Sequence, residues 1–197
     1  MTKKTDRLLV VTGGFLVLEV CLLSGCAHSP VKQHQHCMKI AGMIFLEYAD
    51  EHKGMFPCHT NGSGDALLLL VKDRPQDIPL ICGPGDDGQV FSNALTHGFH
   101  VPESQCSRVY VQGLSRTNDP QLCILFDRRS VPAGDHFYGS GKRVREACMI
   151  DGSMEVVPDK GWTEFSRRQV ELLVAAGFKR EKALEYYPGR RDSIPPR

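Results

Sequence analysis

The sequence predicts an α+β domain, in which helices at both ends of the chain pack on an antiparallel sheet formed by its middle. Residues 33–53 carry apolar side chains at spacings of three and four, which is typical of a helix with one buried face. The segments 108–112, 122–127 and 144–150 are rich in β-branched and aromatic residues and are typical of strands. Helices and strands that occupy separate parts of a chain indicate the α+β class.

Size and composition limit the possible functions. The 197 residues suffice for one domain with a hydrophobic core and short appendages. With 24 Lys and Arg against 23 Asp and Glu, the chain has no basic surplus that would favour nucleic acid as a partner. Its eight cysteines are many for a reducing cytosol, and no two of them form a CxxC pair. The composition therefore favours an exported globular protein.

The N-terminus predicts export and a lipid anchor. A basic start in residues 1–7 precedes a mainly apolar run over 8–23, which is typical of a signal peptide and is too short for the roughly 18 to 20 apolar residues of a spanning helix. The run ends in Leu-Ser-Gly-Cys, which resembles the bacterial lipobox. This resemblance implies removal of residues 1–25 as a lipoprotein signal peptide and transfer of fatty acyl chains, such as palmitate, to Cys26.

Lipid attachment would also fix the compartment of the protein. Ala27 rather than Asp follows the cysteine, and the lipoprotein resemblance implies sorting to the outer membrane of a double-membraned cell. The expected location is the cell membrane or the outer membrane, with the protein facing the periplasm or the cell exterior. Residues 26–32 would then form a short tether between the anchor and the domain.

A second interpretation of the same stretch is a truncated prepilin cut after Gly14. Cleavage there would place Glu19 at the fifth mature position, as in prepilins. However, the apolar run that follows Phe15 ends near Gly25, which is too short to cross about 30 Å of bilayer. The lipobox is therefore the favoured interpretation.

Two helices are expected directly after the tether. The first covers residues 33–53, and Gly54 is well placed as its C-terminal cap. Pro57 prevents any continuation of this helix. A shorter helix is expected over residues 66–71, and it stops before Pro75.

The middle of the chain is expected to hold a strand, a long loop and a hairpin. Residues 78–82 predict a strand, and residues 83–104, rich in Gly, Asp, Asn, His and Pro, predict an irregular loop. Asp151 and Gly152 predict a type I′ hairpin turn before a strand over 153–157, because both residue types tolerate positive φ.

The C-terminal part predicts a helical segment over residues 161–187. Ser166 and Gln169 have the spacing of a capping box, which would open a helix that ends at Gly177. The remaining residues, 188–197, are expected to form a flexible tail.

Five stretches resemble the pseudopilin-like proteins of the bacterial envelope in their order and spacing. They are CMKIAGMIFLEYADEHKGMFP, PLICGPGD, VYVQGLS, LCILFD and CMIDGSMEVV, and with the helix that follows they cover residues 37–173. The resemblance is to type IV pilin-like and type II secretion proteins with an Asp-Gly hairpin near the C-terminus. It implies a pilin-like fold for residues 33–160, with a long N-terminal helix packed on an antiparallel sheet. It also implies a role in secretion or pilus-like assembly, without catalysis.

Two features depart from that family. Its members usually carry a histidine with nine residues between it and the Asp-Gly pair, whereas Gly141 occupies this position and His136 lies further upstream. The long apolar helix by which pilins polymerise is missing and is replaced by the lipobox. This second departure argues against a place in a filament core.

Six cysteines remain after Cys21 is lost with the signal peptide and Cys26 is lipidated. In an oxidising compartment they predict up to three disulfide bonds, each stabilising by roughly 2 to 4 kcal/mol. The hypothesised pairs are Cys37 with Cys58, Cys82 with Cys106, and Cys123 with Cys148. Buried free thiols are the alternative for some of them.

Metal binding is the main alternative function suggested by residue types. The candidate ligands are His34, His36, Cys37, Cys58 and His59 for zinc or copper, and Asp86, Asp87, Gly88 and Asn93 for calcium. The first set lacks a tight C-x-x-C or H-x3-H pair, and the second lacks the closing glutamate of an EF-hand loop. We therefore expect solvated histidines, an ordinary acidic turn, and no metal or other cofactor, with a metal- or small-ligand-binding lipoprotein as the alternative.

No motif in the sequence indicates an enzyme. G-x-S-x-G, H-E-x-x-H, a phosphate-binding loop and a G-x-G-x-x-G after a strand are all missing. The sequence thus predicts a non-enzymatic, lipid-anchored envelope protein. Its expected partners are the membrane and envelope or secretion-assembly proteins, contacted through loops 83–104 and 128–141.

Overall fold

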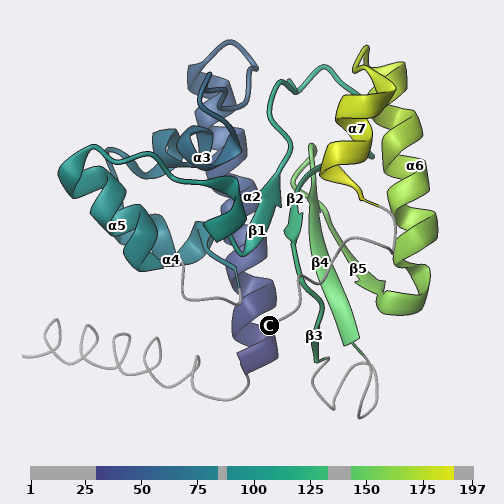
Figure 1. Ribbon diagram of the computed structural model, residues 1–197, viewed down its shortest axis with the longest axis horizontal. Helices are drawn as coiled ribbons and strands as arrows, with labels where there is room; N and C mark the ends of the chain where they lie inside the picture. The colour runs from purple at the N-terminus through teal and green to yellow at the C-terminus, as the bar shows by residue number, and fades with distance from the viewer. Residues whose placement is uncertain (1–29, 84–87, 133–142, 189–197) are drawn as a thin grey trace, which may run out of the picture.

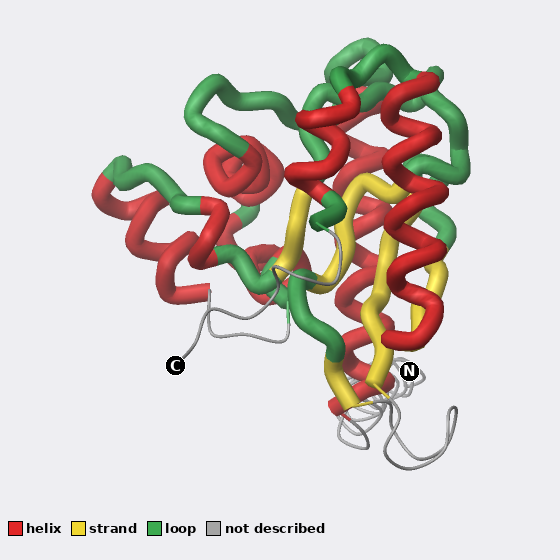
Figure 2. The backbone as a smooth tube through the Cα atoms, turned by 45° about the vertical axis from the view of Figure 1, so that its right-hand side comes forward, coloured by secondary structure: helices red, strands yellow, loops and turns green. Residues whose placement is uncertain are grey.

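The sheet of this protein lies between one long helix on one face and two C-terminal helices on the other (Figure 1). The computed structural model describes residues 30–83, 88–132 and 143–188. The helices and the antiparallel sheet confirm the α+β class. Figure 2 shows the strands enclosed between helices when the molecule is turned.

The long helix is α2, Pro30–Glu51. Its buried side chains, Met38, Ala41 and Phe45, recur every three or four residues, as the sequence predicts. The chain leaves the helix through Lys53 and Gly54, which have positive φ values of 57° and 82°, and the Gly54 amide donates to the carbonyl of Ala49 over 2.7 Å. The helix begins at Pro30, so residues 30–32 belong to it and the expected tether is shorter than predicted. Among the described residues, no helix has both the length and the apolar character needed to cross a membrane.

The segment that follows contains more helix than expected. Helix α3, Ser63–Val71, confirms the second predicted helix and begins three residues earlier. The predicted strand 78–82 is wrong, because Ile78–Ile81 forms α4, which follows the 3₁₀ turn η1, Pro75–Asp77. Pro79 suits the first turn of a helix, and the spacing of Ile78 and Ile81 buries both side chains.

The predicted irregular loop 83–104 is also wrong for most of its described length. It holds α5, Gly88–His97, and the 3₁₀ turn η2, Glu103–Gln105. Phe91 and Ala94, three residues apart, turn the same face of α5 into the core. The polar composition that suggested a loop belongs to the exposed face of this helix.

All strands of the sheet pair in antiparallel fashion. They are β1 (Arg108–Tyr110), β2 (Cys123–Asp127), β3 (Val131–Pro132), β4 (Arg143–Met149) and β5 (Met154–Pro158). β4 pairs with β2 and β3 along one edge and with β5 along the other. The strands predicted over 108–112, 122–127, 144–150 and 153–157 are therefore confirmed within a few residues, and β3 is an addition.

Register fixes which side chains face which layer. Leu125 lies opposite Cys148 on the face toward α2, and Phe126 lies opposite Ala147 on the face toward the C-terminal helices. Phe126 stacks there on Tyr187, with ring centroids 4.8 Å apart. Because both faces are covered, every residue of β2 is buried, which explains its continuous apolar run.

The C-terminal helices are α6, Trp162–Ala175, and α7, Arg180–Tyr186. The predicted capping box is wrong, because α6 starts four residues before Ser166, directly after the 3₁₀ turn η3, Asp159–Gly161. Trp162 packs against Phe126 and makes the first turn part of the core. Gly177, with a φ of 96°, ends the helix as expected.

Candidate functional site

The Asp-Gly turn lies against the long helix α2. Ile150, Asp151 and Gly152 form a three-residue loop, closed by a hydrogen bond from the Gly152 amide to the Met149 carbonyl. Only Gly152 has a positive φ, 81°, so the predicted type I′ turn is wrong and the turn is a type I turn followed by a left-handed glycine. A three-residue loop lets Ile150 reach the core, whereas a two-residue turn would not.

Two glycines make this contact possible. A Cβ on Gly42 of α2 would lie 2.7 Å from Cys148 Sγ and 3.6 Å from the backbone of Gly152. A Cβ on Gly152 would lie 2.8 Å from Leu46 Cδ1. At these two positions α2 and the β4–β5 hairpin are so close that a side chain larger than a hydrogen atom would overlap a neighbouring side chain.

The cysteines occupy three different places in the fold. The structure shows no Sγ–Sγ pair among those it describes, so the three disulfide bonds stay predictions. Cys123 lies opposite Met149 and Cys148 lies opposite Leu125, with a register shift between Cys123 and Leu125, so the two cysteines are not directly opposite one another. The register therefore does not support a bond between Cys123 and Cys148.

The other two hypothesised pairs differ in their support. Cys82 and Cys106 are both buried, and their neighbours touch, since the Gly83 amide donates to Ser107 Oγ over 2.7 Å. In contrast, Cys58 follows Pro57, whose carbonyl accepts from Tyr110 Oη, and Tyr110 stacks on Phe45, eight residues or about 12 Å along α2 from Cys37. The fold thus brings the segments of the second pair together and keeps those of the first pair apart.

Burial makes the sheet thiols poor nucleophiles. It raises the pKa of Cys148 to about 12, although the charge of Arg108 acts in the opposite direction. The pKa of Cys123 is raised further, first by burial and then by the nearby Cys148. Neither thiol is suited to redox or nucleophilic chemistry in the folded protein.

A buried charged cluster joins the sheet to α4. Arg108 and Asp127 are almost fully buried, with Arg108 Nε 3.6 Å from Asp127 Oδ1. Arg108 Nη1 also donates to the Leu80 carbonyl over 2.8 Å. Asp127 Oδ2 accepts from the amide of Glu146, whose side chain is buried on the same face. These groups hold α4 against the sheet.

A second polar cluster fastens the start of α3. The Asp65 carboxylate accepts from the Val101 amide over 2.7 Å and from Asn61 Nδ2 over 3.0 Å, and His100 Nδ1 lies 2.8 Å from it. Burial alone would raise the pKa of Asp65, but these hydrogen bonds and His100 lower it below the ordinary value of 3.8. His59 Nδ1 lies 3.7 Å away. The cluster ties α3 to the segment after α5.

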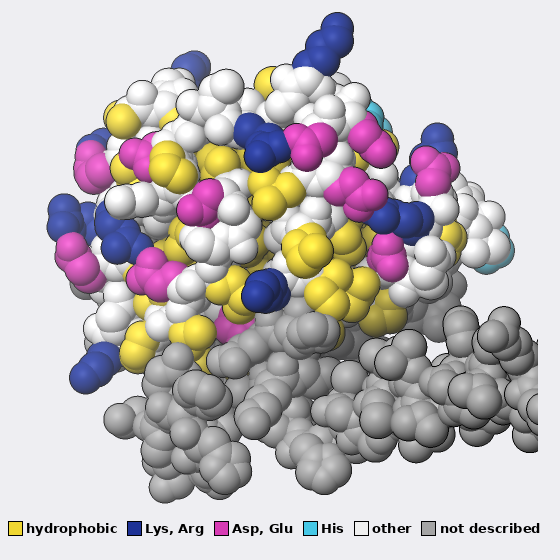
Figure 3. All heavy atoms as spheres, turned by 180° about the vertical axis from the view of Figure 1, so that it is seen from behind, with side chains coloured by type: hydrophobic (Ala, Val, Ile, Leu, Met, Phe, Trp, Pro, Cys, Tyr) yellow, Lys and Arg dark blue, Asp and Glu magenta, His cyan; other side chains and the backbone are white. Residues whose placement is uncertain are grey.

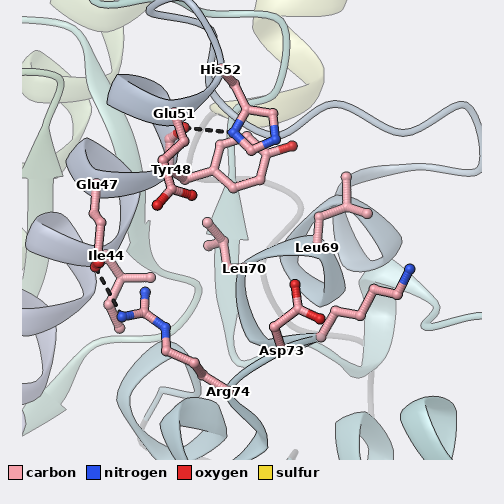
Figure 4. Close-up of a pocket in the computed structure, with 10 residues that line it drawn as sticks. Ile44, Glu47, Tyr48, Glu51, His52, Leu69, Leu70, Asp73 and Arg74 are labelled. Carbon is pink, nitrogen blue, oxygen red and sulfur yellow. Dashed lines mark hydrogen bonds and ion pairs between the residues drawn. The ribbon is translucent and has the colours of Figure 1, made fainter.

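A groove of about 450 Å³ opens between α2 and α3 (Figure 4). Ile44, Leu69 and Leu70 form its apolar part, and the Tyr48 ring stacks on His52 at 3.8 Å. Its remaining lining residues carry charge and are Glu47, Glu51, Lys72, Asp73 and Arg74. The apolar part of such a groove can hold the alkyl portion of a side chain from a partner, and its charged residues can form ion pairs or hydrogen bonds with the polar end of that side chain.

Charge on the surface agrees with the neutral composition. Figure 3, the view from behind Figure 1, shows Lys and Arg mixed with Asp and Glu among apolar side chains. No continuous basic area is visible among the described residues on this face.

Several predicted site residues cannot be placed. Cys26, Asp86, Asp87, His136, Gly141 and the side chains of His34 and His36 lie outside the described part of the chain. Gly88 and Asn93 belong to α5, where Asn93 Oδ1 accepts from Gln89 Nε2 over 2.8 Å. Over residues 37–83, 88–132 and 143–188, no group of three His, Cys, Asp or Glu is arranged to hold a metal ion.

The sequence analysis did not identify Arg108, Asp65 or the groove. Arg108 and Asp127 stand nineteen residues apart, and only the strand register brings them together. Asp65 follows Ser63 and Gly64 at the start of a helix, a signal that could have marked it as a helix-start residue.

Comparison of the chain with protein-family models, curated proteins and solved structures found no match.

Proposed function

We propose that this chain is a lipid-anchored protein of the cell envelope, with a pseudopilin-like domain that serves interaction or assembly rather than catalysis. The observation that carries the proposal is the contact between α2 and the Asp-Gly turn through Gly42 and Gly152. The pseudopilin resemblance implies a long N-terminal helix packed on an antiparallel sheet, in a class with an Asp-Gly hairpin near the C-terminus, and the contact between α2 and this turn supports that interpretation.

The distance from Cys26 to α2 supports the anchor. Only three residues separate Cys26 from Pro30, so an acylated cysteine would lie within about 14 Å of the helix start. Helix α2 has 22 residues and is about 33 Å long. If α2 stood upright, the groove beside Tyr48 would lie far from the bilayer, where a partner in the envelope could reach it.

The polar clusters support a structural role. Arg108 and Asp65 each bind backbone groups of distant segments and are used to hold helices in place. The thiols of Cys123 and Cys148 are buried and have raised pKa values. These features stiffen the domain, as a protein that presents a fixed surface requires.

Membrane fractionation tests the anchor. The full-length protein is expressed in a bacterium with Cys26→Ser, and with Cys21→Ser as the matched control in the same apolar run. We expect the control to remain in the membrane pellet and to incorporate labelled palmitate. We expect Cys26→Ser to lose the label. Because an uncleaved signal could itself hold this variant in the membrane, the variant is also made with a cleavable, non-lipidated signal peptide in place of residues 1–25, and we expect that form to leave the pellet.

The outcome that contradicts the proposal is equally clear. Equal palmitate labelling of wild type and Cys26→Ser would exclude this cysteine as the anchor. A mature protein that begins at Phe15 would favour the truncated prepilin instead. Zinc or copper in a 1:1 ratio in protein purified without a tag would favour the metal-binding alternative.

A further inference from the structure

A second groove, of about 260 Å³ and mainly apolar, lies between α6 and α7. On α6 it is lined by Trp162, Ser166 and Val170, which are four residues apart and share one face. On α7 and just after it, Leu184 and Tyr187 complete the apolar wall. Leu184 is 47% exposed, which is high for a leucine beside an apolar groove.

Ser166 gives this groove an unused hydrogen-bond donor. Its side chain is 6% exposed, and its buried hydroxyl has no hydrogen-bond partner among the described residues. A buried hydroxyl without a partner destabilises the fold relative to one that is bonded. An occupant that supplies a carbonyl oxygen at this point would remove that cost.

The chain itself reaches this groove. Pro188 lines it and is the last described residue, so the chain continues to residue 189 from a position at this groove. Their sequence, GRRDSIPPR, contains the single Pro-Pro pair of the whole chain, Pro195-Pro196, preceded by Ile194. Ile194 lies six residue steps beyond Pro188, and the about 19 Å that these steps span when extended exceeds the roughly 12 Å from Trp162 to Val170 along α6.

The chemistry of this segment matches the groove. A Pro-Pro pair favours the polyproline II helix, whose carbonyl groups make no internal hydrogen bonds, and proline has no amide proton. The prolyl residues therefore offer backbone acceptors only, and such a carbonyl can accept from the Ser166 hydroxyl. Polyproline II segments bind grooves lined by aromatic side chains, and Trp162 and Tyr187 supply them here.

We propose that residues 193–197 bind back into the groove between α6 and α7, with Ile194 and Pro195 against Trp162 and Val170 and a prolyl carbonyl accepting from Ser166. The segment closes a short loop on its own domain, so little chain entropy is lost. This inference is independent of the lipid anchor and of the role proposed for the domain.

Fluorescence of Trp162 tests the proposal directly, because it is the only tryptophan in the chain. The full-length protein is compared with Ile194→Asp/Pro195→Ala/Pro196→Ala in the same chain and with a version that ends at Pro188. We expect both altered proteins to show about twofold stronger acrylamide quenching and a red-shifted emission. A synthetic peptide of residues 189–197 should reverse both effects in the shortened protein.

The hydroxyl is tested with Ser166→Ala in the shortened protein, with exposed Ser153→Ala as the matched control. We expect Ser166→Ala to weaken peptide binding about two- to tenfold, the range expected for one hydrogen bond, and Ser153→Ala to leave it unchanged. Circular dichroism of each variant checks that the fold is retained.

Two results would overturn the proposal. One is equal quenching in all three chains, together with no effect of the peptide on the shortened protein. The other is quenching in the full-length protein that depends on protein concentration, since this would assign the groove to a segment of a second copy.

Discussion

At the scale of single residues, two glycines decide how closely the helix and the hairpin approach. Gly42 faces Cys148 and Gly152 across the interface, and Gly152 faces Leu46. The sequence marked Gly152 through the Asp-Gly pair, but it gave no signal for Gly42, which stands inside an ordinary helical pattern. Gly42 is needed because the β4–β5 hairpin packs against it, and this contact is seen only in the structure.

Gly42→Ala is expected to lower the free energy of unfolding by about 1 to 3 kcal/mol, because the new Cβ would overlap Cys148 Sγ. Gly88→Ala in α5 is the matched control, since its Cβ would meet only Ile78 Cγ2 at 3.9 Å. Urea unfolding followed by circular dichroism measures both. Partial recovery in Gly42→Ala/Cys148→Ala is expected, and a Gly42→Ala protein as stable as wild type would refute the close contact.

Thiol reactivity should follow burial. Cys58 is exposed, whereas burial raises the pKa of Cys148 to about 12 and that of Cys123 beyond it. At pH 8 a pKa of about 12 leaves only about one thiol in ten thousand as thiolate. Iodoacetamide labelling with peptide mapping should therefore modify Cys58 first, and Cys123 and Cys148 only after denaturation. Labelling of all three at one rate in the native protein would contradict the burial described.

Low pH should weaken the hydrogen bonds by which the Asp65 carboxylate holds the start of α3. The folded pKa of Asp65 is below its ordinary value of 3.8, so its contribution to stability is complete above that value and is lost as the pH falls through the folded pKa. Asp65→Asn should lower stability at pH 7 by about 1 to 3 kcal/mol and reduce the further loss between pH 5 and pH 2. Thermal unfolding at several pH values measures both effects. If the stability of the two proteins fell in parallel as the pH is lowered, the role assigned to the Asp65 carboxylate would be wrong.

At the scale of elements, the sequence predicted the strands better than the segment from residue 78 to residue 104. β2 was visible as a continuous apolar segment, and its burial on both faces explains why. The short helix α4 was predicted as a strand, because a run of five apolar and proline residues has no clear period. Helix α5 was missed because its polar side chains outnumber the two that are buried.

The charged pair that joins α4 to the sheet could not have been found from the sequence. Arg108 and Asp127 each look like an ordinary charge at the end of a strand, and only antiparallel pairing puts them opposite one another. Asp151 and Gly152, by contrast, were correctly placed at a hairpin because the turn residues are local. Local signals were thus recovered and long-range contacts were not.

Arg108→Leu is expected to lower the free energy of unfolding by about 3 to 5 kcal/mol, because it removes a buried cation beside the buried carboxylates of Asp127 and Glu146. Arg116→Leu is the control, since Arg116 pairs with Asp50 at the surface and should change stability by less than about 1 kcal/mol. Equal effects of the two substitutions in urea unfolding would show that the buried pair has no special weight.

At the scale of the whole molecule, the proposal places a lipid anchor just before a unit in which α2 packs on the sheet. Three residues lie between Cys26 and the described helix, and Gly42 and Gly152 let that helix pack closely on the β4–β5 hairpin. A lipid at Cys26 would therefore set the position of the domain above the bilayer, although α2 itself cannot span it. The proposed role in envelope assembly depends on this arrangement.

The intact mass of the protein extracted from membranes is the most direct test of that arrangement. We expect a chain that begins at Cys26 and carries the added mass of a diacylglyceryl group and a further acyl chain, which lipase treatment reduces. A chain that begins at Phe15 with no added mass would contradict the lipid anchor and the function proposed from it.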